Sequence, residues 1–285
     1  MDRIDSCVLC RAPARGTAPG IGGYRVCRVC DVAWRALEDP PDLAEGWDRH
    51  YYADSQVLEM HQRRISGLES IARRITGISP GRGRLLDVGA GIGIFMEAAA
   101  RLGWSVEGVE PSVIAAQLAR ERTQAPVYQG LLENLEAPEA AYDAVLAFDT
   151  LRHVPDPMAF LLRARRLLRP GGILVIREVH RGLVTGRARI RSLLGKAAGP
   201  PGNRAYDYRQ CFSPKSFLFA YQAVGLTGIW VEPSPVFAES DDKPSLSASL
   251  LKRSLGLVSR SAYRLSGRRI VLGPNLLAIG KAPSP

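Results

Sequence analysis

The sequence predicts an α/β protein in which a mostly parallel sheet with helices on both faces follows a small cysteine-rich unit. From residue 84 onward, short β-rich runs alternate with helical segments. Such alternation implies parallel strands joined by crossover helices that cover both faces of the sheet. Before that stretch, four cysteines lie in two CxxC pairs within the first thirty residues. A chain of 285 residues is long enough for about two such units.

The composition excludes several other classes of protein. With 46% hydrophobic and 23% charged residues, the chain is neither disordered throughout nor a fibrous rod. The longest run without a charged residue, 216–231, has 16 positions, which is fewer than the roughly 20 that span a bilayer. The N-terminus lacks the continuous apolar stretch of a secretory signal. We therefore expect a cytoplasmic protein with no transmembrane segment.

The net charge of +10 is unevenly distributed along the chain. Residues 1–50 are close to neutral, with seven arginines and eight acids, whereas residues 163–204 hold eleven basic residues and one acid. A second basic stretch, 243–269, has seven Lys or Arg and no acid. Such a concentrated excess indicates an anionic partner.

The cysteine-rich unit, residues 1–45, is predicted to be a zinc ribbon. Its ligands are Cys7, Cys10, Cys27 and Cys30, and sixteen residues separate the two CxxC pairs, a spacing typical of a four-thiolate zinc site. A reducing cytosol disfavours disulfides, and a redox CxxC normally follows a strand of a thioredoxin-like unit. Such knuckles usually continue with Gly, which accepts a positive φ. Because Arg11 and Asp31 stand there instead, we expect imperfect knuckle geometry.

The remaining elements follow from hydrophobic periodicity. Residues 46–80 form a connector, with a helix predicted over 48–78. A larger domain over residues 81–285 follows, with basic insertions at 180–210 and 240–270. Its strands are predicted at 84–88, 105–110, 126–128, 144–148, 172–179, 226–231 and 275–279, and its helices at 92–102, 112–122, 156–168, 214–224 and 247–265.

A glycine-rich turn follows the first predicted strand of this domain, in the sequence LLDVGAGIG at 85–93. Glycines let the backbone approach a ligand, and the next helix offers free N–H groups, so a nucleotide-like ligand is expected. The dinucleotide pattern GxGxxG needs Gly at 94, where Ile94 stands, which disfavours NAD and FAD. Glu110 ends the second strand, where its carboxylate can accept both hydroxyls of a ribose. The alternative is an acid that only begins the next helix.

Two further motifs complete the pattern. The strand before Asp149 leads into LRHVPDP at 151–157, and LRPGGILVI at 168–176 leads into another buried strand. In this order and spacing, the motifs resemble class I S-adenosylmethionine-dependent methyltransferases, close to the ubiquinone-biosynthesis-like branch. The cysteine ribbon and Tyr51-Tyr52 resemble bacterial members of sugar, polysaccharide or natural-product pathways.

The resemblance implies a Rossmann-like, seven-stranded sheet whose final strand is antiparallel. It also implies that S-adenosylmethionine binds at the carboxyl ends of the first, second and fourth strands. Its methionine portion would lie near the glycine turn, its ribose at Glu110, and its adenine near the Leu131–Leu132 region and Phe148. The cofactor-binding residues expected on this basis are Asp87, Gly89, Ala90, Gly91, Glu110, Leu132, Phe148 and Asp149.

Methyl transfer depends mainly on positioning, and a base is needed only where the acceptor loses a proton. His153 is the candidate catalytic base, because imidazole titrates near neutral pH; the alternative is a histidine that only hydrogen-bonds backbone at a helix entry. Members of the resembled branch usually have Glu where Arg152 stands, and often Glu-His where Asp207-Tyr208 stand. The acceptor site is therefore expected to differ from theirs.

The leading hypothesis is O- or C-methylation of a small molecule: a sugar, a nucleotide-linked sugar or a natural-product intermediate. The basic residues Arg187, Arg189 and Arg191 would then meet a phosphorylated acceptor or a membrane surface, or simply form a solvated helix face. One rival is a ribosomal-RNA methyltransferase, although RNA recognition should make the ribbon basic. Another is a non-catalytic zinc-ribbon binding protein, which the intact 87–93 turn and Glu110 disfavour.

Overall fold

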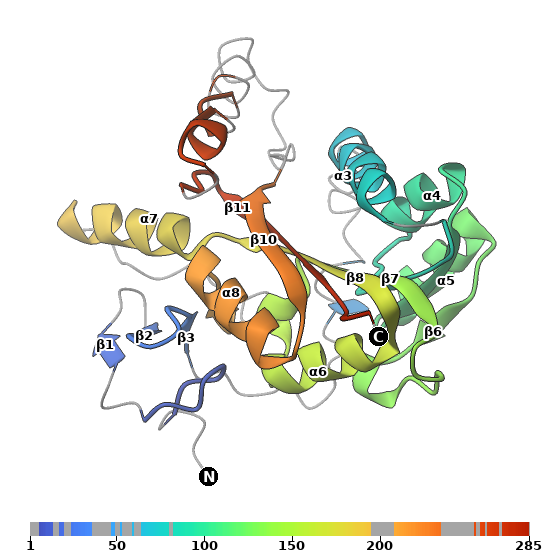
Figure 1. Ribbon diagram of the computed structural model, residues 1–285, viewed down its shortest axis with the longest axis horizontal. Helices are drawn as coiled ribbons and strands as arrows, with labels where there is room; N and C mark the ends of the chain where they lie inside the picture. Colours follow the sequence, from blue (N-terminus) through green and yellow to red (C-terminus); the bar gives the residue numbers. More distant parts are fainter. Residues whose placement is uncertain are drawn as a thin grey trace.

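The computed structural model describes residues 6–13, 17–19, 24–35, 47–48, 52, 59, 64–79, 82–194, 208–234, 254, 257–259, 261–267 and 270–284. Within these residues the chain forms a seven-stranded sheet and a smaller four-stranded sheet. Figure 1 shows the large sheet with helices packed on it and the small sheet beside one of its edges. No helix in the described part is both long and apolar enough to cross a bilayer.

The seven-stranded sheet has the order β10-β11-β8-β7-β4-β5-β6. The pairs β4·β5, β4·β7, β5·β6 and β7·β8 are parallel, and β11 runs antiparallel to both β8 and β10. The predicted Rossmann-like sheet with an antiparallel last strand is thus confirmed. Its strands are β4 (Arg84–Val88), β5 (Ser105–Glu110), β6 (Val127–Gln129), β7 (Tyr142–Phe148), β8 (Leu168–Val179), β10 (Thr227–Pro233) and β11 (Asn275–Lys281).

Helices cover both faces of this sheet. Alternate residues of β7 belong to two hydrophobic clusters: Val145 packs with helices α6 and α8, whereas Leu146 packs with α3, α4 and α5. This alternation is the period of a strand buried on both sides. The helices are α3 (Ile65–Ile78), α4 (Ile94–Arg101), α5 (Val113–Thr123), α6 (Pro157–Leu167), α7 (Arg181–Leu193) and α8 (Pro214–Ala223), with single 3-10 turns η4 (Leu132–Asn134) and η5 (Leu151–His153).

The four-stranded sheet pairs strands near the N-terminus with a strand from much later in the sequence. It consists of β1 (Thr17–Pro19), β2 (Arg25–Cys27), β3 (Ala33–Trp34) and β9 (Gln210–Cys211), in that order. The first three strands belong to the ribbon, but β9 follows the large sheet's fifth strand in the chain and lies at the end of the segment predicted as a basic insertion. The ribbon sheet is therefore completed by the larger domain.

Some predicted elements differ from those observed. Strand β8 begins at Leu168 and includes the Pro-Gly-Gly run, with a register shift against β7 between Tyr142 and Ala144. Part of the predicted 180–210 insertion is helix α7, which projects away from the sheet (Figure 1), and exposes Ile190, Leu193 and Leu194. The side chains of Arg187, Arg189 and Arg191 lie outside the described residues. So does most of 49–63 and 240–256, where the connector helix and the 247–265 helix were predicted to begin.

Candidate active site

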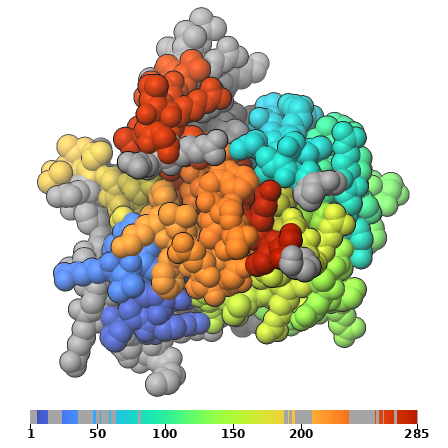
Figure 2. Space-filling view, viewed as in Figure 1, coloured from blue at the N-terminus to red at the C-terminus, as the bar shows by residue number. Residues whose placement is uncertain are grey.

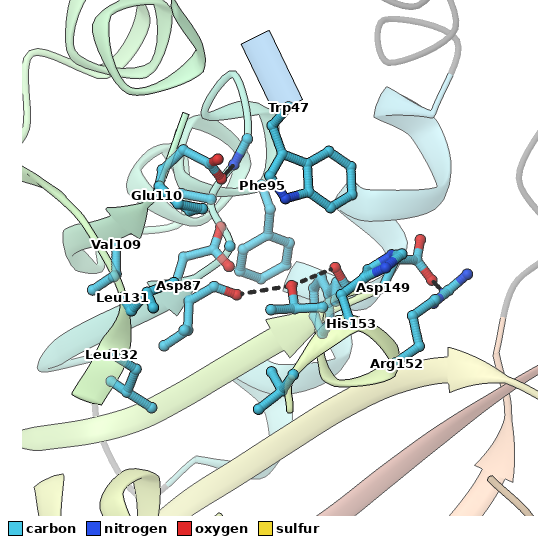
Figure 3. A pocket seen from close by; sticks show the side chains of 18 of the residues that line it. Trp47, Asp87, Phe95, Val109, Glu110, Leu131, Leu132, Asp149, Arg152 and His153 are labelled. Atoms are coloured by element: carbon cyan, nitrogen blue, oxygen red, sulfur yellow. Dashed lines mark hydrogen bonds and ion pairs between the residues drawn. The ribbon is translucent and has the colours of Figure 1, made fainter. Parts of the chain in front are cut away.

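A pocket of about 470 Å³ opens at the carboxyl ends of β4, β5 and β7. Figure 3 shows Glu110 and Leu132 on one side of it, His153 and Arg152 on the other, and Trp47 across the top. Among its lining residues are all the predicted cofactor and catalytic residues: Asp87, Gly89, Ala90, Gly91, Glu110, Leu132, Phe148, Asp149 and His153. The sequence motifs, spread over 67 positions, thus meet in one cavity.

The glycine turn brings main chain to the floor of the pocket. Gly89 and Gly91 have φ of 75° and 53°, a region that residues with a Cβ enter rarely. A Cβ added to Gly89 would lie 2.2 Å from Thr150 Oγ1, and one added to Gly91 would lie 3.1 Å from the Tyr52 hydroxyl. The backbone N–H groups of Gly89 and Ala90 both donate to the Val109 carbonyl, at 2.8 and 3.1 Å. A side chain at Gly89 would therefore displace Thr150, and one at Gly91 would crowd the Tyr52 hydroxyl.

Glu110 links the glycine turn to the start of α5. Its two carboxylate oxygens accept backbone N–H groups from Gly91 at 2.8 Å and from Ser112 at 3.0 Å. Burial raises the pKa of Glu110 to about 7, although these two hydrogen bonds oppose the shift. Burial, followed by repulsion from Glu110, raises the pKa of Asp87 to about 7 as well. Both carboxyls therefore titrate near neutral pH.

The wall beside Glu110 is apolar. Leu132 begins η4 and is almost fully buried, and Phe148 at the end of β7 meets the ring of Phe95 edge-on at 4.8 Å between centroids. Val109 and Leu131 complete this side of the pocket. A flat heterocycle fits such a surface, because it buries its faces against apolar side chains and loses little water.

Asp149 lies at the centre of a cluster of charges on the opposite side. It has a φ of 59°, and its carboxylate pairs with Arg152, with Arg177 at 2.5 Å and with Arg64 at 3.5 Å. Burial alone would raise the pKa of Asp149, but these three guanidinium groups hold it at about 2. Arg152 also donates to Glu178, at 2.7 Å. In this cluster three cations surround two carboxylates.

His153 ends η5, and aromatic rings flank its imidazole. The ring of Trp47 lies edge-on at 5.0 Å between centroids, and that of Tyr208 lies at 6.0 Å. Burial, reinforced by the Arg152 charge, lowers the pKa of His153 to about 3. The imidazole is therefore neutral at physiological pH and offers an unprotonated nitrogen, but it is a weaker base than an exposed histidine.

The four predicted zinc ligands form a single cluster. Their sulfur atoms all lie within 4.8 Å of one another, with Cys7 3.4 Å from Cys30 and Cys10 3.5 Å from Cys27. Tetrahedral zinc with bonds of about 2.3 Å places its sulfurs about 3.8 Å apart, and no disulfide joins these cysteines. The residues present thus fit a structural zinc ion.

The knuckle geometry corrects one expectation. Arg11 and Asp31 follow the second cysteine of each pair and have φ of 58° and 63°, the backbone conformation that Gly usually supplies. Their N–H groups donate to the carbonyls of Cys7 and Cys27 at 3.0 Å each. The two knuckles are therefore regular, and the absence of Gly does not distort them.

Several lining residues were not found from the sequence. Trp47, Arg64 and Tyr208 all line the pocket, yet none belongs to a motif, and Tyr208 was noticed only as a departure from the resembled branch. Thr150 also lines it and lies within the motif around Asp149, but was not singled out. Trp47 is held in place through its neighbour Asp48, whose carboxylate accepts N–H groups from Val113 and Ile114 at 3.2 Å each. A carboxylate is favourable at the N-terminus of α5. Because Asp48 is far from that helix in the sequence, the sequence alone does not show that its carboxylate lies there.

Comparison with known proteins identifies the family. The model of a family described as "Methyltransferase domain" matches residues 60–231, which is more than half of the chain. The protein belongs to this methyltransferase family.

The curated relatives cover smaller parts. A ubiquinone biosynthesis O-methyltransferase of Paramagnetospirillum magneticum is 32% identical over 131 residues, which are 44% of this chain and 51% of the relative. One from Rhodopseudomonas palustris strain BisB18 is 36% identical over 83 residues, 28% of this chain and 33% of the relative. The chain thus spans about half or less of the curated relatives it matches.

Solved structures share the fold at low identity. An S-adenosylmethionine-dependent methyltransferase of Thermotoga maritima has a TM-score of 0.57 at 19% identity, and the match covers 84% of this chain and 99% of that one. Phosphoethanolamine N-methyltransferase 2 of Haemonchus contortus, solved with S-adenosyl-L-methionine, has a TM-score of 0.55 at 19% identity, covering 88% and 61%. At these sequence identities, the similarity shows a shared fold and nothing more.

Proposed function

We propose that this protein transfers a methyl group from S-adenosylmethionine to a small-molecule acceptor. The observation that carries the proposal is the shared pocket, in which the glycine turn, Glu110 and the apolar wall face His153 across one cavity. A volume of about 470 Å³ lies in the ordinary range for small-ligand sites. The pocket offers a donor side and, within the same enclosure, an acceptor side.

On the donor side, each part of S-adenosylmethionine has a matching group. Glu110 would hold the ribose hydroxyls, because its oxygens keep lone pairs beyond those used by Gly91 and Ser112. The Leu131–Leu132 segment and Phe148 would hold the adenine. The backbone of the glycine turn would hold the methionine portion. Ionised Asp87 and Glu110 favour a positively charged donor in this buried setting.

On the acceptor side, His153 orients the nucleophile. Its neutral imidazole accepts a hydrogen bond from the acceptor hydroxyl, and the rings of Trp47 and Tyr208 exclude water around it. When bound, S-adenosylmethionine would supply the methyl group and the sulfur leaving group, so the contribution of this chain would be mainly to position the acceptor. When the acceptor loses its proton, nearby Asp149 stabilises the imidazolium that forms. Asp149 itself is held ionised by its arginines and does not act as an acid.

The acceptor class is proposed to be a sugar, a nucleotide-linked sugar or a natural-product intermediate. The guanidinium groups of Arg64 and Arg152 line this part of the pocket beside Asp149, which favours an acceptor with an anionic or electron-rich group. The resemblance to O-methyltransferases supports transfer to oxygen.

A ribosomal-RNA substrate is less well supported. The ribbon packs into the same hydrophobic cluster as α6 and α8, and in Figure 2 its blue residues lie against the orange surface of α8. The described part of the ribbon is therefore packed against the larger domain. A non-catalytic binding protein is disfavoured because the pocket retains both a donor side and an acceptor side.

We also propose one structural zinc ion on the four clustered cysteines, in a cytoplasmic setting that keeps the thiols reduced. Protein purified without a metal-affinity step should contain about one zinc per chain, and Cys27→Ser should lower that content. A folded wild-type protein without metal would contradict the proposal.

Tritiated S-adenosylmethionine tests the function. Incubation with total RNA and, separately, with a small-molecule extract of the source cells should transfer label only to the small-molecule fraction. Loss of this label in Gly89→Ala protein that is shown to be folded would assign the reaction to this pocket. Label in RNA would support the rival function, and label in neither fraction, with no donor binding, would refute the proposal.

A further inference from the structure

The tips of the two zinc knuckles reach the larger domain. Arg11 donates to Asp156 at 2.6 Å, and Asp156 is the residue whose carboxylate caps α6 through the N–H groups of Met158 and Ala159. Asp31 accepts from Arg181, the first residue of α7, at 2.9 Å. These two ion pairs hold the ribbon at Asp156, just after η5, and at α7, which begins one residue after His180.

Between these points the ribbon is joined to segment 208–211. The pairing of β3 with β9 sets Ala33 opposite Cys211 and Trp34 opposite Gln210. The Arg35 N–H donates to the Arg209 carbonyl at 2.9 Å. The Tyr208 carbonyl accepts two more hydrogen bonds from the ribbon, from the Tyr24 hydroxyl at 2.9 Å and from Arg35 Nε at 3.0 Å.

Segment 208–211 in turn holds η5. The buried amide of Gln210 donates to the carbonyls of Leu151 at 2.6 Å and Val154 at 2.8 Å. The Arg209 N–H donates to the Arg152 carbonyl at 2.9 Å. Three carbonyls around His153 are therefore held by residues that pair with the ribbon, and the Tyr208 ring lies against both His153 and Arg152.

We propose that the ribbon positions the acceptor wall of the pocket, and that Gln210, Arg11 and Asp31 are its positioning residues. Metal binding stabilises the knuckles and thereby positions β3, which pairs with β9. Gln210 of β9 then holds η5, the turn that carries His153. The description of this wall as the acceptor side rests on the proposed function. The donor side is built from β4, β5 and the start of α5, and its hydrogen bonds run among Gly89, Ala90, Gly91, Val109, Glu110 and Ser112.

The knuckle-tip residues offer a selective test. Gly accepts the positive φ at both positions, so the double variant Arg11→Gly/Asp31→Gly removes the ion pairs and preserves the backbone that the zinc site needs. Gln210→Leu removes both amide hydrogen bonds at similar side-chain length. Gln222→Leu, at an exposed position of α8, is the matched control.

The first measurement is hydrogen exchange followed by mass spectrometry on the peptide containing residues 149–156, in protein of measured zinc content. In wild type, the His153 N–H donates to Thr150 and the Val154 N–H donates to Leu151. We expect these amides to exchange about tenfold faster or more in Gln210→Leu, in the double Gly variant and in zinc-depleted protein, because their local opening is no longer restrained. Exchange in the glycine-turn peptide, 85–95, should change less than about twofold.

The second measurement is the NMR titration of the His153 ring, assigned by His153→Gln. Loosening η5 exposes the imidazole and raises its lowered pKa toward the ordinary value, so the ring signals of the same three samples should begin to titrate between pH 8 and pH 6, where the zinc ligands stay bound. Wild type and Gln222→Leu should show no titration of this ring in that range. If the zinc-replete double Gly variant, which is expected to fold, shows wild-type exchange and wild-type titration, the proposal is overturned. Failure of S-adenosylhomocysteine to bind wild type would instead refute the proposed function, and neither readout here depends on that binding.

Discussion

Donor affinity should depend on pH through Glu110. The pKa of this buried carboxyl is about 7 in the free protein, and the ribose hydroxyls need the ionised form as their acceptor. The ligand therefore binds the deprotonated protein, and affinity rises with pH. For one group with a pKa of about 7, the ionised fraction falls about tenfold between pH 8 and pH 6, so the dissociation constant should increase about tenfold.

Isothermal titration calorimetry with 5′-methylthioadenosine isolates this effect, because the ligand carries the ribose and adenine but not the titratable amino acid. Glu110→Gln should bind more weakly at pH 8 and lose the pH dependence attributable to this group. Its amide NH₂ would also face the N–H of Gly91 or Ser112, which leaves a buried donor unpaired and destabilises the folded variant by about 1–3 kcal/mol. Glu121→Gln, at an exposed position of α5, serves as the control. A wild-type affinity that is constant from pH 6 to pH 8, or a Glu110→Gln variant with unchanged affinity, would refute the assignment.

Other predictions concern the turn, the acceptor wall and the basic helix. Gly89→Ala should destabilise the fold by about 1–3 kcal/mol and abolish donor binding, because its Cβ would lie 2.2 Å from Thr150 Oγ1. The control Gly77→Ala, with open space around it, should not destabilise the fold. Thermal unfolding with and without S-adenosylhomocysteine measures both the stability and the binding. His153→Gln should lower kcat about 10²-fold or more if the acceptor must lose a proton and leave donor affinity within about twofold; equal kcat would leave His153 without a catalytic role. Replacing Arg187, Arg189 and Arg191 with Gln should raise the acceptor's Michaelis constant at low salt, and wild-type kinetics would identify a merely solvated face.

Much of the fold could be predicted because its signals are local. Strands 84–88 and 105–110 have the predicted bounds, since the glycine turn follows the first and Pro111-Ser112, a helix-start signal, follows the second. The glycine turn and Glu110 could be placed together because adjacent parallel strands end at the same sheet edge. Two-residue strands such as β3 and β9 carry no such periodicity. Their pairing joins segments more than 170 residues apart, and no local sequence pattern predicts it.

The acceptor side was harder to predict because its properties come from long-range packing. Sequence alone gives His153 the pKa of a solvated imidazole, near 6.5. The structure lowers it to about 3 through burial, and the rings of Trp47 and Tyr208 contribute to that burial. Arg11 and Asp31 illustrate the same limit. Because Gly is absent at these two positions, the sequence predicted a distorted knuckle. In the structure both residues adopt a positive φ, and their charged side chains form ion pairs with Asp156 and Arg181.

A crystal structure with S-adenosylhomocysteine tests the central claim most directly, because it locates both sides of the pocket at once. The account predicts the ribose hydroxyls at Glu110, the adenine against Leu132 and Phe148, and the sulfur facing the space enclosed by Trp47, His153 and Tyr208. A ligand bound elsewhere, or one whose sulfur points away from His153, would contradict it.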